Sequence, residues 1–438
     1  MSLIIFSKQT SNRLEYVLNL IFHELLGLDY QLVTTKKTFT ESSLYKVNYS
    51  REELTSDLQI LPEALLFEKN IDEKYPSLGL VRQTKVLFHN PRCSFGYDIF
   101  SACFYLVSRY EEYFPKTYDH HGRFSSSDSI LTAHKILDKP VVNLWVQDLI
   151  REINKEEENI SFQPKSFNFL STIDIDQAYQ YRHKEFFRTH LGYAKDLLGG
   201  EIEKVKKRWQ VRKRRLRDPF DSYEFQFSQH QKYGNESLYF IQTGSLGKFD
   251  KNLSIKNKFF QKLIKKIGNQ TNTSVGIHPS YNSFHQLEKL LEEKDNLEKL
   301  MGRTIDQSRQ HYLRFQLPRT YQILLDLGIR KEYSMGYSDQ IGFRAGIAAP
   351  FFWFDLKKNE RTKLKVFPFC FMDITPQFYY QMNPEEAIAV HRTLMQEIKN
   401  VGGFYSSLWH NESLGNENQW KGWQQVYQNI LADTTKEW

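Results

Sequence analysis

The chain has 438 residues, of which 40% are hydrophobic and 25% charged, and its formal net charge is +7. These values are typical of a soluble globular protein with two or three domains. Cys93, Cys103 and Cys370 are too few and too widely spaced for a disulfide framework or a cysteine zinc site. No window predicts a transmembrane helix, and the first residues, "MSLIIFSKQTSNRLEY", lack the basic region and cleavage site of a signal peptide. We therefore expect a cytoplasmic protein.

Residues 1–160 are expected to form a mixed α/β domain. The segment 12–27, "NRLEYVLNLIFHELLG", has apolar residues at helical spacing and ends on a glycine, a frequent helix end. Residues 95–114 predict a second, very apolar helix. The polar stretch 151–166 breaks the hydrophobic pattern and contains a proline, so we predict the domain boundary there. Extended segments are expected at 28–34 and 85–89.

From residue 167 onward, predicted strands and helices alternate. The strands are expected at 167–173, 237–242, 273–278, 331–337, 364–373 and 403–410. The helices are expected at 255–268, 284–300, 318–328 and 384–402. This alternation predicts parallel strands that can close into a (β/α) barrel, which we assign to residues 165–435. In such folds the functional groups lie at the carboxyl ends of the strands.

Two carboxylates, Asp174 and Asp176, end the first of these strands in "FNFLSTIDID". Side chains at positions i and i+2 of a strand point to the same face. Two anions held together repel each other, and each resists burial unless a cation or a proton compensates it. The pair therefore predicts either a cation site or, as is equally common for a DxD pair, a solvated turn or helix cap.

Other predicted strands also end in side chains that can bind a metal or transfer protons. They and the segments between them carry His278, Ser280, Asn282, Ser283, Arg309, His311, Arg314, Asp339, Arg344, Asp373, His410 and Glu412. Each has a structural interpretation as well: a histidine at a strand end is often hydrogen-bonded in the core, and Arg344 in "GFRAG" fits a salt bridge. Their shared position favours function, because folding does not require several strands to bring Asp, His and Arg to one edge.

Together, the motifs "STIDID", "GIHPS", "LRFQLP", "GYSDQIGFRAG" and "LWHNES" resemble the polysaccharide deacetylase superfamily, the chitooligosaccharide-deacetylase homology domain of carbohydrate esterase family 4. The resemblance covers about residues 165–430 and is greatest to a variant group with an extra N-terminal domain. It implies a distorted, incomplete (β/α) barrel. It also implies a divalent metal, usually zinc, and hydrolysis of N- or O-acetyl groups on sugars.

The resemblance implies roles for single residues. Asp174 matches the catalytic base, and His410 matches the general acid. Arg314 resembles the arginine that orients the base. Asp176 and His278 match two metal ligands. A metal held by these groups lowers the pKa of a bound water and polarises the acetyl carbonyl.

Three further residues are expected at or near the substrate. Arg344, Tyr281 and Asp373 are assigned to substrate binding. Asp373 is also the favoured carboxylate, ahead of Asp339, for holding His410 in its charged form.

One position departs from the family pattern. The family has a second metal-binding histidine four residues after the first, and Asn282 stands there in this chain. An amide oxygen is a poorer zinc ligand than imidazole. Three outcomes stay open: Asn282 or Ser283 completes a weaker site, His285 or His311 substitutes, or the metal is lost.

The segment 203–217, "EKVKKRWQVRKRRLR", holds nine Lys and Arg against one Glu. We interpret it as a solvated amphipathic helix rather than a nucleic-acid site, because no nucleic-acid fold signature accompanies it. Contact with phospholipid or an acidic glycan stays open.

The predicted function is that of a metal-dependent carbohydrate deacetylase. Its expected partner is an acetylated oligosaccharide or polysaccharide precursor in bacterial surface-glycan biosynthesis, with no nucleic acid. Two alternatives remain: an inactive glycan-binding or assembly protein on the same barrel, and a glycosyltransferase whose DxD carboxylates chelate a nucleotide diphosphate through a metal.

Overall fold

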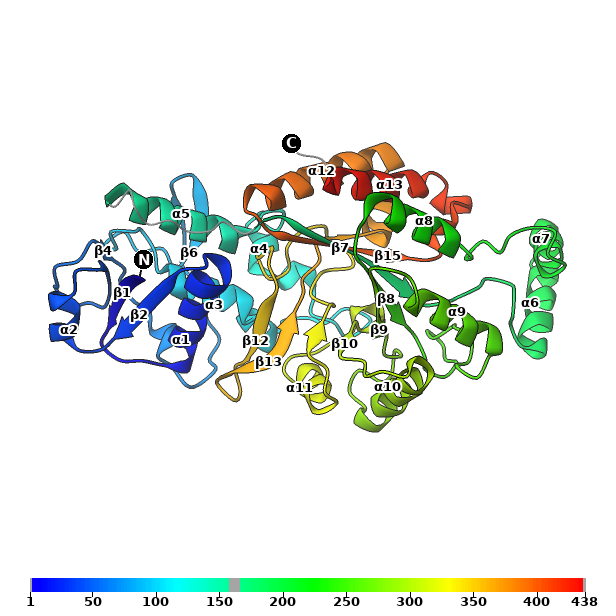
Figure 1. Ribbon diagram of the computed structural model, residues 1–438, viewed down its shortest axis with the longest axis horizontal. Coiled ribbons are helices and arrows are strands. Elements are labelled where there is room, and N and C mark those ends of the chain that lie inside the picture. The colour runs from blue at the N-terminus through cyan, green and yellow to red at the C-terminus, as the bar shows by residue number, and fades with distance from the viewer. Residues whose placement is uncertain (1, 157–165, 436–438) are drawn as a thin grey trace.

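The computed structural model describes residues 2–156 and 166–435, which form two main sheets covered by helices (Figure 1). The first sheet lies in the N-terminal part and has four parallel strands in the order β2-β1-β3-β4. These strands are β1 (Ser2–Ser7), β2 (Asp29–Val33), β3 (Tyr45–Tyr49) and β4 (Leu58–Gln59). A separate antiparallel pair consists of β5 (Leu78–Val81) and β6 (Thr84–Leu87). The extended segments predicted at 28–34 and 85–89 correspond to β2 and β6.

The two helices predicted in the N-terminal part are present, each in two pieces. The first is α1 (Asn12–Leu18), which continues as the π-helical η1 (Asn19–Leu25). The second is α3 (Ile99–Val107), followed by the 3-10 turn η3 (Tyr110–Tyr113). Arg109, with φ of 55°, interrupts the second helix. The other helical elements here are η2 (Ala64–Leu66), α2 (Lys36–Glu41), η4 (Ser126–Asp128), α4 (Ile130–Ala133) and α5 (Val141–Glu156).

The second sheet has nine strands in the order β12-β13-β11-β10-β9-β8-β7-β15-β14, and all pairs except β12–β13 are parallel. Its strands are β7 (Asn168–Ile175), β8 (Ser237–Ile241), β9 (Thr273–Ile277), β10 (Gln307–Ser308), β11 (Lys331–Glu332), β12 (Phe351–Asp355), β13 (Glu360–Val366), β14 (Phe371–Met372) and β15 (Phe404–His410).

Helices connect most of these strands and cover the sheet (Figure 1). They are α6 (Phe186–Leu198), α7 (Ile202–Arg212), α8 (Tyr223–Tyr233), α9 (Lys258–Gly268), α10 (Leu287–Met301), η5 (His311–Leu313), α11 (Arg319–Asp326), η6 (Thr375–Tyr379), α12 (Pro384–Asn400), η7 (Ser413–Gly415), η8 (Asn418–Trp420) and α13 (Trp423–Thr434). The helices predicted at 255–268, 284–300, 318–328 and 384–402 correspond to α9, α10, α11 and α12, and the amphipathic helix predicted at 203–217 overlaps α7. Among the described residues, no helix has the length and apolar character needed to cross a bilayer.

Two strand predictions require correction. The single strand expected at 364–373 is divided into β13 and β14, which lie at different places in the sheet. Pro368 stands between them, and proline has no N–H to donate to a neighbouring strand. The strand expected at 331–337 pairs over only two residues, and β10 and β12 were not predicted.

The short link between β13 and β14 shows that the large sheet is curved. In sheet order these strands are seven spacings apart, which would be roughly 34 Å in a flat sheet. Residues 367–370 alone join them, and a chain of that length spans at most ~18 Å. The sheet therefore curls until its two edges approach each other. In the described part of the chain no strand pairing closes it, so the architecture is an open, curved α/β sheet.

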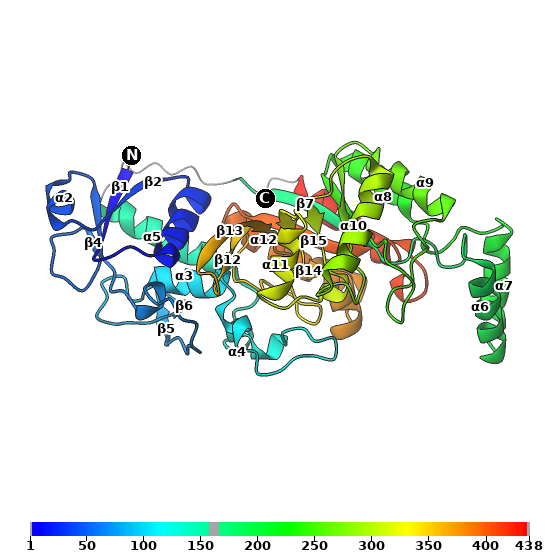
Figure 2. The same ribbon diagram turned by 90° about the horizontal axis from the view of Figure 1, so that it is seen from below.

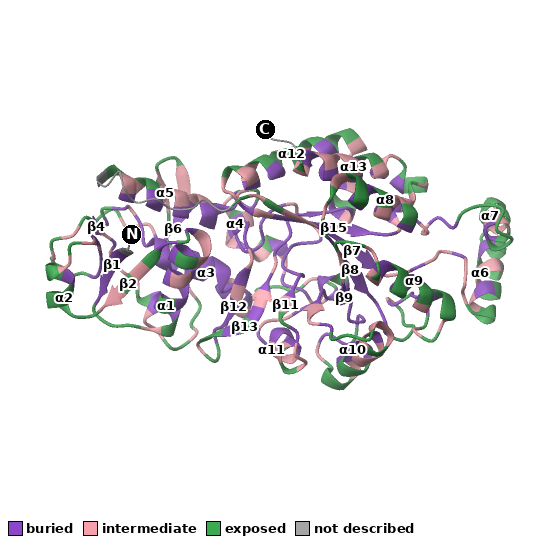
Figure 3. Cartoon of the chain, in the orientation of Figure 1, coloured by how far each residue is buried: buried purple, intermediate pink, exposed green. Residues whose placement is uncertain are grey.

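The N-terminal part and the nine-stranded sheet share one apolar core (Figure 3). Phe104 of α3 packs edge-on against Phe354 of β12, with ring centroids 5.1 Å apart. The hydroxyl of Tyr16 donates a hydrogen bond to the carbonyl oxygen of Phe352, at 2.6 Å. The domain boundary predicted at 151–166 begins inside α5, and its centre lies outside the described residues. The division into two domains stays a prediction.

Candidate metal and catalytic site

Six of the polar side chains predicted at or between the strand ends line one cavity of about 200 Å³. Because parallel strands share one carboxyl edge, the residues that end β7, β9, β10 and β15 are brought together there. The register places His410 of β15 directly beside Asp174 of β7. The lining includes Asp174, Asp176, His278, His311, His410 and Glu412.

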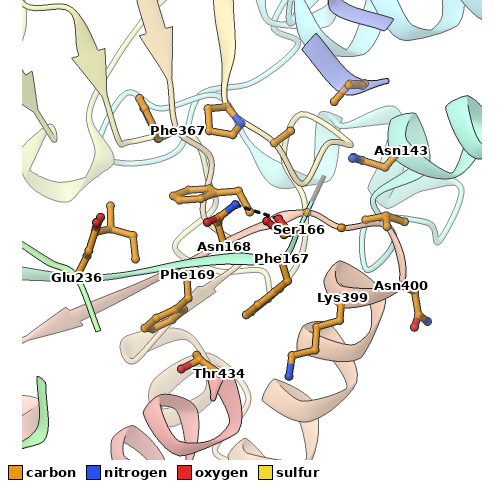
Figure 4. A pocket seen from close by; sticks show the side chains of 18 of the residues that line it. Asn143, Ser166, Phe167, Asn168, Phe169, Glu236, Phe367, Lys399, Asn400 and Thr434 are labelled. Carbon is orange, nitrogen blue, oxygen red and sulfur yellow. Dashed lines mark hydrogen bonds between the residues drawn. The ribbon is translucent and has the colours of Figure 1, made fainter. Parts of the chain in front are cut away.

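A larger cavity, of about 960 Å³, lies at the opposite edge of the sheet, around the amino ends of β7 and β15 (Figure 4). Its apolar lining includes Phe167, Phe169 and Phe367. Among the described residues that line it, Glu236 is the only acid and there is no histidine. Its lining therefore offers little acid–base or metal chemistry, unlike that of the smaller cavity.

Asp176, His278 and His311 form the only group of potential metal ligands found in the described part of the chain. The distance from Asp176 Oδ1 to His278 Nε2 is 3.0 Å, and that from Asp176 Oδ2 to His311 Nε2 is 3.4 Å. Two ligands that are each ~2.1 Å from a zinc ion lie at most ~4.2 Å apart. These two separations fit ligands that share one ion.

Hydrogen bonds on the far side of each ring orient the two histidines. His278 Nδ1 donates to the carbonyl oxygen of Arg309, at 2.6 Å. His311 Nδ1 lies 3.0 Å from Asp250 Oδ1, which accepts its proton. A histidine that donates from Nδ1 can present the lone pair of Nε2 to a metal. Asp250 was not singled out in the sequence, and it supports His311 from the segment that follows β8.

The contact between Asp176 and His278 is favourable only if a proton or a metal cation lies between the two side chains. With Nδ1 as the donor, His278 in its neutral form turns a lone pair toward Asp176 Oδ1, and this oxygen is buried without a hydrogen-bond partner. Two acceptors 3.0 Å apart repel each other unless a proton or a cation lies between them. A metal ion bound by both atoms would remove this conflict.

Without a metal, protons take the place of the cation. Burial alone would raise the pKa of Asp176, but His311 and His278 hold it well below its usual range. Burial would likewise lower the pKa of His311, but Asp176 and Asp250 raise it to about 9. Asp176 is therefore an ionised carboxylate, and His311 must give up a proton to become a ligand.

Asp174 is buried beside this group and is paired with an arginine. Arg309 Nη1 donates to Asp174 Oδ1 at 2.9 Å, and the guanidinium lies over the ring of Phe240, 4.5 Å from its centroid. Asp174 Oδ2 lies 3.8 Å from His278 Nε2. The guanidinium of Arg309 therefore supplies the cation that compensates the buried carboxylate of Asp174.

The expected contact of Arg314 with Asp174 is wrong. Arg314 donates instead to the backbone oxygens of His121 and Tyr281, at 2.6 and 2.7 Å. Arg309 directly follows the last residue of β10, so its side chain starts at the carboxyl edge of the sheet. The arginine that follows a strand is visible in "SRQHYL", residues 308–313, but the two-residue strand β10 was too short to be recognised from its sequence pattern.

His410 lies on the other side of Asp176 and is held by Asp373. His410 Nδ1 is 2.9 Å from Asp373 Oδ1, and its backbone N–H donates to Asp373 Oδ2 at 2.8 Å. Burial alone would lower the pKa of His410, but Asp373 and the other carboxylates raise it to about 10. Burial raises the pKa of the neighbouring Glu412 to about 7, although the His410 cation opposes the rise. His410 is therefore a cation whose Nε2 faces the cavity, 3.7 Å from Asp176 Oδ2.

The assignment of Asp373 and Arg344 to substrate binding requires correction. Asp373 is fully buried and engaged by His410, which agrees with the second role considered for it. Arg344 is 2% exposed, and its Nε and Nη2 donate to the two carboxylate oxygens of Glu112, at 2.9 and 2.8 Å. Arg344 therefore links the large sheet to the N-terminal part. Asp339 accepts a hydrogen bond from Ser126 and does not contact His410.

Asn282 is also excluded from the ligand group. Asn282 is exposed in the turn at residues 281–285, and it does not line the cavity. His285 does not line the cavity either, so of the substitutes considered it is His311 that stands beside Asp176 and His278. Tyr281 lies behind the cavity, where its hydroxyl is 2.9 Å from His121 Nδ1.

The N-terminal part contributes a wall of the cavity through His121 and Arg123. Arg123 Nη1 donates to the carbonyl oxygen of Tyr312 at 2.8 Å, and its Nε to Asp119 at 2.6 Å. Burial lowers the pKa of His121 to about 4, so its ring is neutral. These residues were not predicted, because they precede the predicted barrel and "DHHGR" was the only local signal.

A family model described as a family of unknown function (DUF7033) matches residues 3–158. No curated protein matches the chain. Similar solved structures include a polysaccharide deacetylase from Bacillus cereus, 12% identical with a TM-score of 0.29, over 61% of this chain and 86% of that one. A protein from Mycobacterium smegmatis, provisionally assigned as a polysaccharide deacetylase, is 12% identical with a TM-score of 0.39, over 62% of this chain and 85% of that one.

A CE4 family pseudoenzyme from Bacillus anthracis is 10% identical with a TM-score of 0.32, over 63% of this chain and 64% of that one. Similarity at these levels carries no information on activity. The activity has to be inferred from the side chains themselves.

Proposed function

We propose that the protein is a metal-dependent hydrolase that removes an acetyl group from the nitrogen or oxygen of a sugar. The observation that carries this proposal is the 3.0 Å contact between Asp176 Oδ1 and His278 Nε2, two acceptors that a shared metal ion would reconcile. On either side of it stand a paired carboxylate, Asp174, and a paired imidazolium, His410. A cation site between a base and an acid has the layout of a hydrolytic centre.

Asp176, His278 and His311 would hold the metal, which we propose is zinc because two of the three ligands are imidazoles. When bound, the metal supplies a Lewis acid that polarises the acyl carbonyl and acidifies water. Asp250 and the Arg309 carbonyl keep the two rings turned so that each Nε2 points toward the Asp176 carboxylate.

The two flanking groups would move the protons. Asp174 accepts a proton from the water that attacks the acyl carbon, while Arg309 keeps this carboxylate in place as a positioning residue. His410 donates its Nε2 proton to the nitrogen or oxygen that leaves the acyl carbon. The acyl C–N or C–O bond breaks, a new C–O bond forms with water, and acetate and the free amine or alcohol are released.

The cavity suits a small acyl group better than a bulky one. Its volume of about 200 Å³ is below the ~300–1,000 Å³ of pockets that enclose drug-sized ligands. Tyr312 and Tyr379, 38% and 51% exposed, stand on its lining and offer aromatic faces to a sugar ring. With the motif resemblance, this supports an acetylated sugar of a surface glycan as the substrate.

The proposal is tested by measuring acetate release from N-acetylated and O-acetylated oligosaccharides by the zinc-loaded protein. Asp174→Asn and His410→Ala are expected to lower kcat at least 100-fold each, because each removes one proton-transfer group. Asn282→Ala is the matched control and should leave kcat unchanged, since Asn282 is exposed and outside the cavity. A zinc-loaded wild type that releases no acetate from either class of substrate would contradict the proposal.

A further inference from the structure

A helical hairpin, α6–α7, stands apart from the rest of the protein in both views (Figures 1 and 2). Its two helices are held together by an ion pair between Arg208 and Asp196, at 2.7 Å, both of which are shielded from solvent. Its base is fixed by Asp218, whose carboxylate accepts the backbone N–H groups of residues 180–182 at 2.8–2.9 Å. The hairpin is therefore a structured element, held by specific contacts, that projects into solvent.

The face of α6 turned to solvent is apolar. Phe187, Leu191 and Leu198 occupy positions i, i+4 and i+11, which lie on one side of a helix, and they are 80%, 69% and 90% exposed. Phe186 adds a second exposed ring at the start of the helix, and Trp209 of α7 is half exposed. A helix of a globular protein normally turns such a stripe toward the core. Here the described part of the chain leaves the stripe uncovered, which favours a partner that covers it.

The hairpin also carries the positive charge of the molecule. Residues 184–217 contain twelve Lys and Arg and four Asp and Glu, a net charge of +8, whereas the whole chain has +7. The remaining residues together are thus close to neutral. In the described part of the chain, Arg212, Lys213 and Arg215 form no ion pair, although Arg215 lies over the ring of Trp209, 4.6 Å from its centroid.

We propose that the α6–α7 hairpin docks the protein on the surface of an anionic lipid bilayer. Apolar side chains that enter the headgroup region, together with lysines and arginines that bind anionic lipids, are the two contributions that hold a helix on a membrane surface. Trp209 beside Arg215 fits the same boundary, where a ring with one polar edge is favoured.

Two other occupants fit the surface less well. A second copy of the chain would bring another hairpin with a charge of +8 against this one, and like charges oppose that contact. A nucleic acid would complement the charge, but its phosphates leave the stripe of Phe187, Leu191 and Leu198 uncovered. A bilayer with anionic headgroups satisfies both the charge and the apolar stripe.

The position of the hairpin connects docking to the cavity. The hairpin is inserted after the carboxyl end of β7, the same end that carries Asp174 and Asp176. Docking through α6–α7 would therefore bring the cavity edge of the sheet closer to the lipid surface than the opposite edge. A substrate attached to a lipid would meet the cavity there. The docking itself does not depend on the proposed hydrolysis.

The test measures sedimentation of the full chain with vesicles of phosphatidylcholine alone and of phosphatidylcholine mixed with phosphatidylglycerol. The wild type is expected to sediment with the anionic vesicles and to be released by high salt. The triple variant Arg212→Gln, Lys213→Gln and Arg215→Gln should have a roughly 100-fold lower partition coefficient, from the contribution of each cation near an anionic surface. For the triple variant Phe187→Ser, Leu191→Ser and Leu198→Ser, the partition coefficient should fall by at least the same factor, because apolar surface no longer enters the headgroup region.

Matched controls change the same kinds of residue elsewhere. Lys258→Gln, Lys262→Gln and Lys265→Gln on the exposed side of α9 remove three charges, and Tyr75→Ser with Leu80→Ser removes exposed apolar groups from the N-terminal part. Both control variants should bind anionic vesicles as the wild type does. Circular dichroism and cooperative unfolding verify that every variant is folded.

Three results would overturn the proposal. The first is absence of vesicle binding by the wild type, or equal binding to neutral and anionic vesicles. The second is a lipid-free dimer that becomes a monomer in the Phe187, Leu191 and Leu198 variant, which would identify a second copy as the occupant. The third is binding to an RNA oligonucleotide that survives the loss of these three apolar residues while vesicle binding is absent.

Discussion

Replacing Arg309 with methionine is expected to lower the free energy of unfolding by about 3–5 kcal/mol. Arg309 is fully buried, and its partner Asp174 is 2% exposed, so the variant leaves an uncompensated carboxylate inside the protein. Methionine has a similar length and keeps an apolar contact with Phe240, over whose ring the guanidinium lies. Most of the loss therefore reports the missing charge and hydrogen bonds rather than a cavity.

A double-mutant cycle separates the ion pair from the other contacts of Arg309. Arg309 also donates to the carbonyl oxygen of Tyr333, at 3.0 Å, and this bond is lost in the single variant as well. In the cycle with Asp174→Asn it cancels, and we expect a coupling energy of about 1–3 kcal/mol. Urea denaturation of the metal-free protein, followed by tryptophan fluorescence, gives the four free energies of unfolding.

Arg314→Met is the matched control for this cycle. Arg314 contacts two backbone oxygens and not Asp174, so its cycle with Asp174→Asn should be additive to within about 0.5 kcal/mol. A coupling below about 0.5 kcal/mol in the Arg309 cycle would refute the reasoning. So would a larger coupling of Asp174 with Arg314 than with Arg309.

Four further predictions concern the cavity. His311→Gln should weaken zinc binding at least tenfold, as measured by competition with a chromophoric chelator, whereas an equal effect of Asn282→Ala would contradict the ligand assignment. Zinc affinity of the wild type should rise as the pH increases toward about 9, because His311 must lose a proton; a pH-independent affinity would argue against this ligand. The charged pair of His410 and Asp373 should contribute its full stabilisation below the unfolded histidine pKa of about 6.5. This contribution to the free energy of unfolding should be lost as the pH rises through the folded pKa of about 10. Hydrolysis should fall over the same alkaline range, and Asp373→Asn should move this fall to lower pH; an unmoved pH profile would contradict the role of the pair. Arg123→Ala should raise KM for the acetylated sugar roughly tenfold with zinc affinity unchanged, and an unchanged KM would exclude the N-terminal part from substrate binding.

Long segments with a clear pattern were predictable, and short ones were not. The strand β7 and the helices α9 and α12 have enough residues for their period to be recognised. The strands β10, β11 and β14 have two residues each, and their pairing depends on neighbours far along the chain. The division at Pro368 follows from a local property of proline, and that signal was available in the sequence.

The site residues that could be predicted from the sequence are those that stand directly at the end of a strand. Asp174, Asp176, His278 and His410 are of this kind, and the structure brings all four to the cavity. Which arginine meets Asp174 is decided by a side chain that crosses between strands, and spacing along the chain does not report this. For the same reason, spacing did not show that His311 rather than Asn282 stands beside Asp176 and His278. The ligands of one metal ion must be neighbours in space, and their spacing along the sequence can vary.

The register between β7 and β15 also determines when the site can assemble. The paired residues Asp174 and His410 are separated by 236 positions along the chain, and β14 adds to the sheet only through β15. During synthesis, the region from β7 to β13 emerges before the strand that completes the cavity. Pairing at such a separation is slow, because a long loop must close before any contact forms. The two proton-transfer groups are therefore expected to meet in one of the last steps of folding.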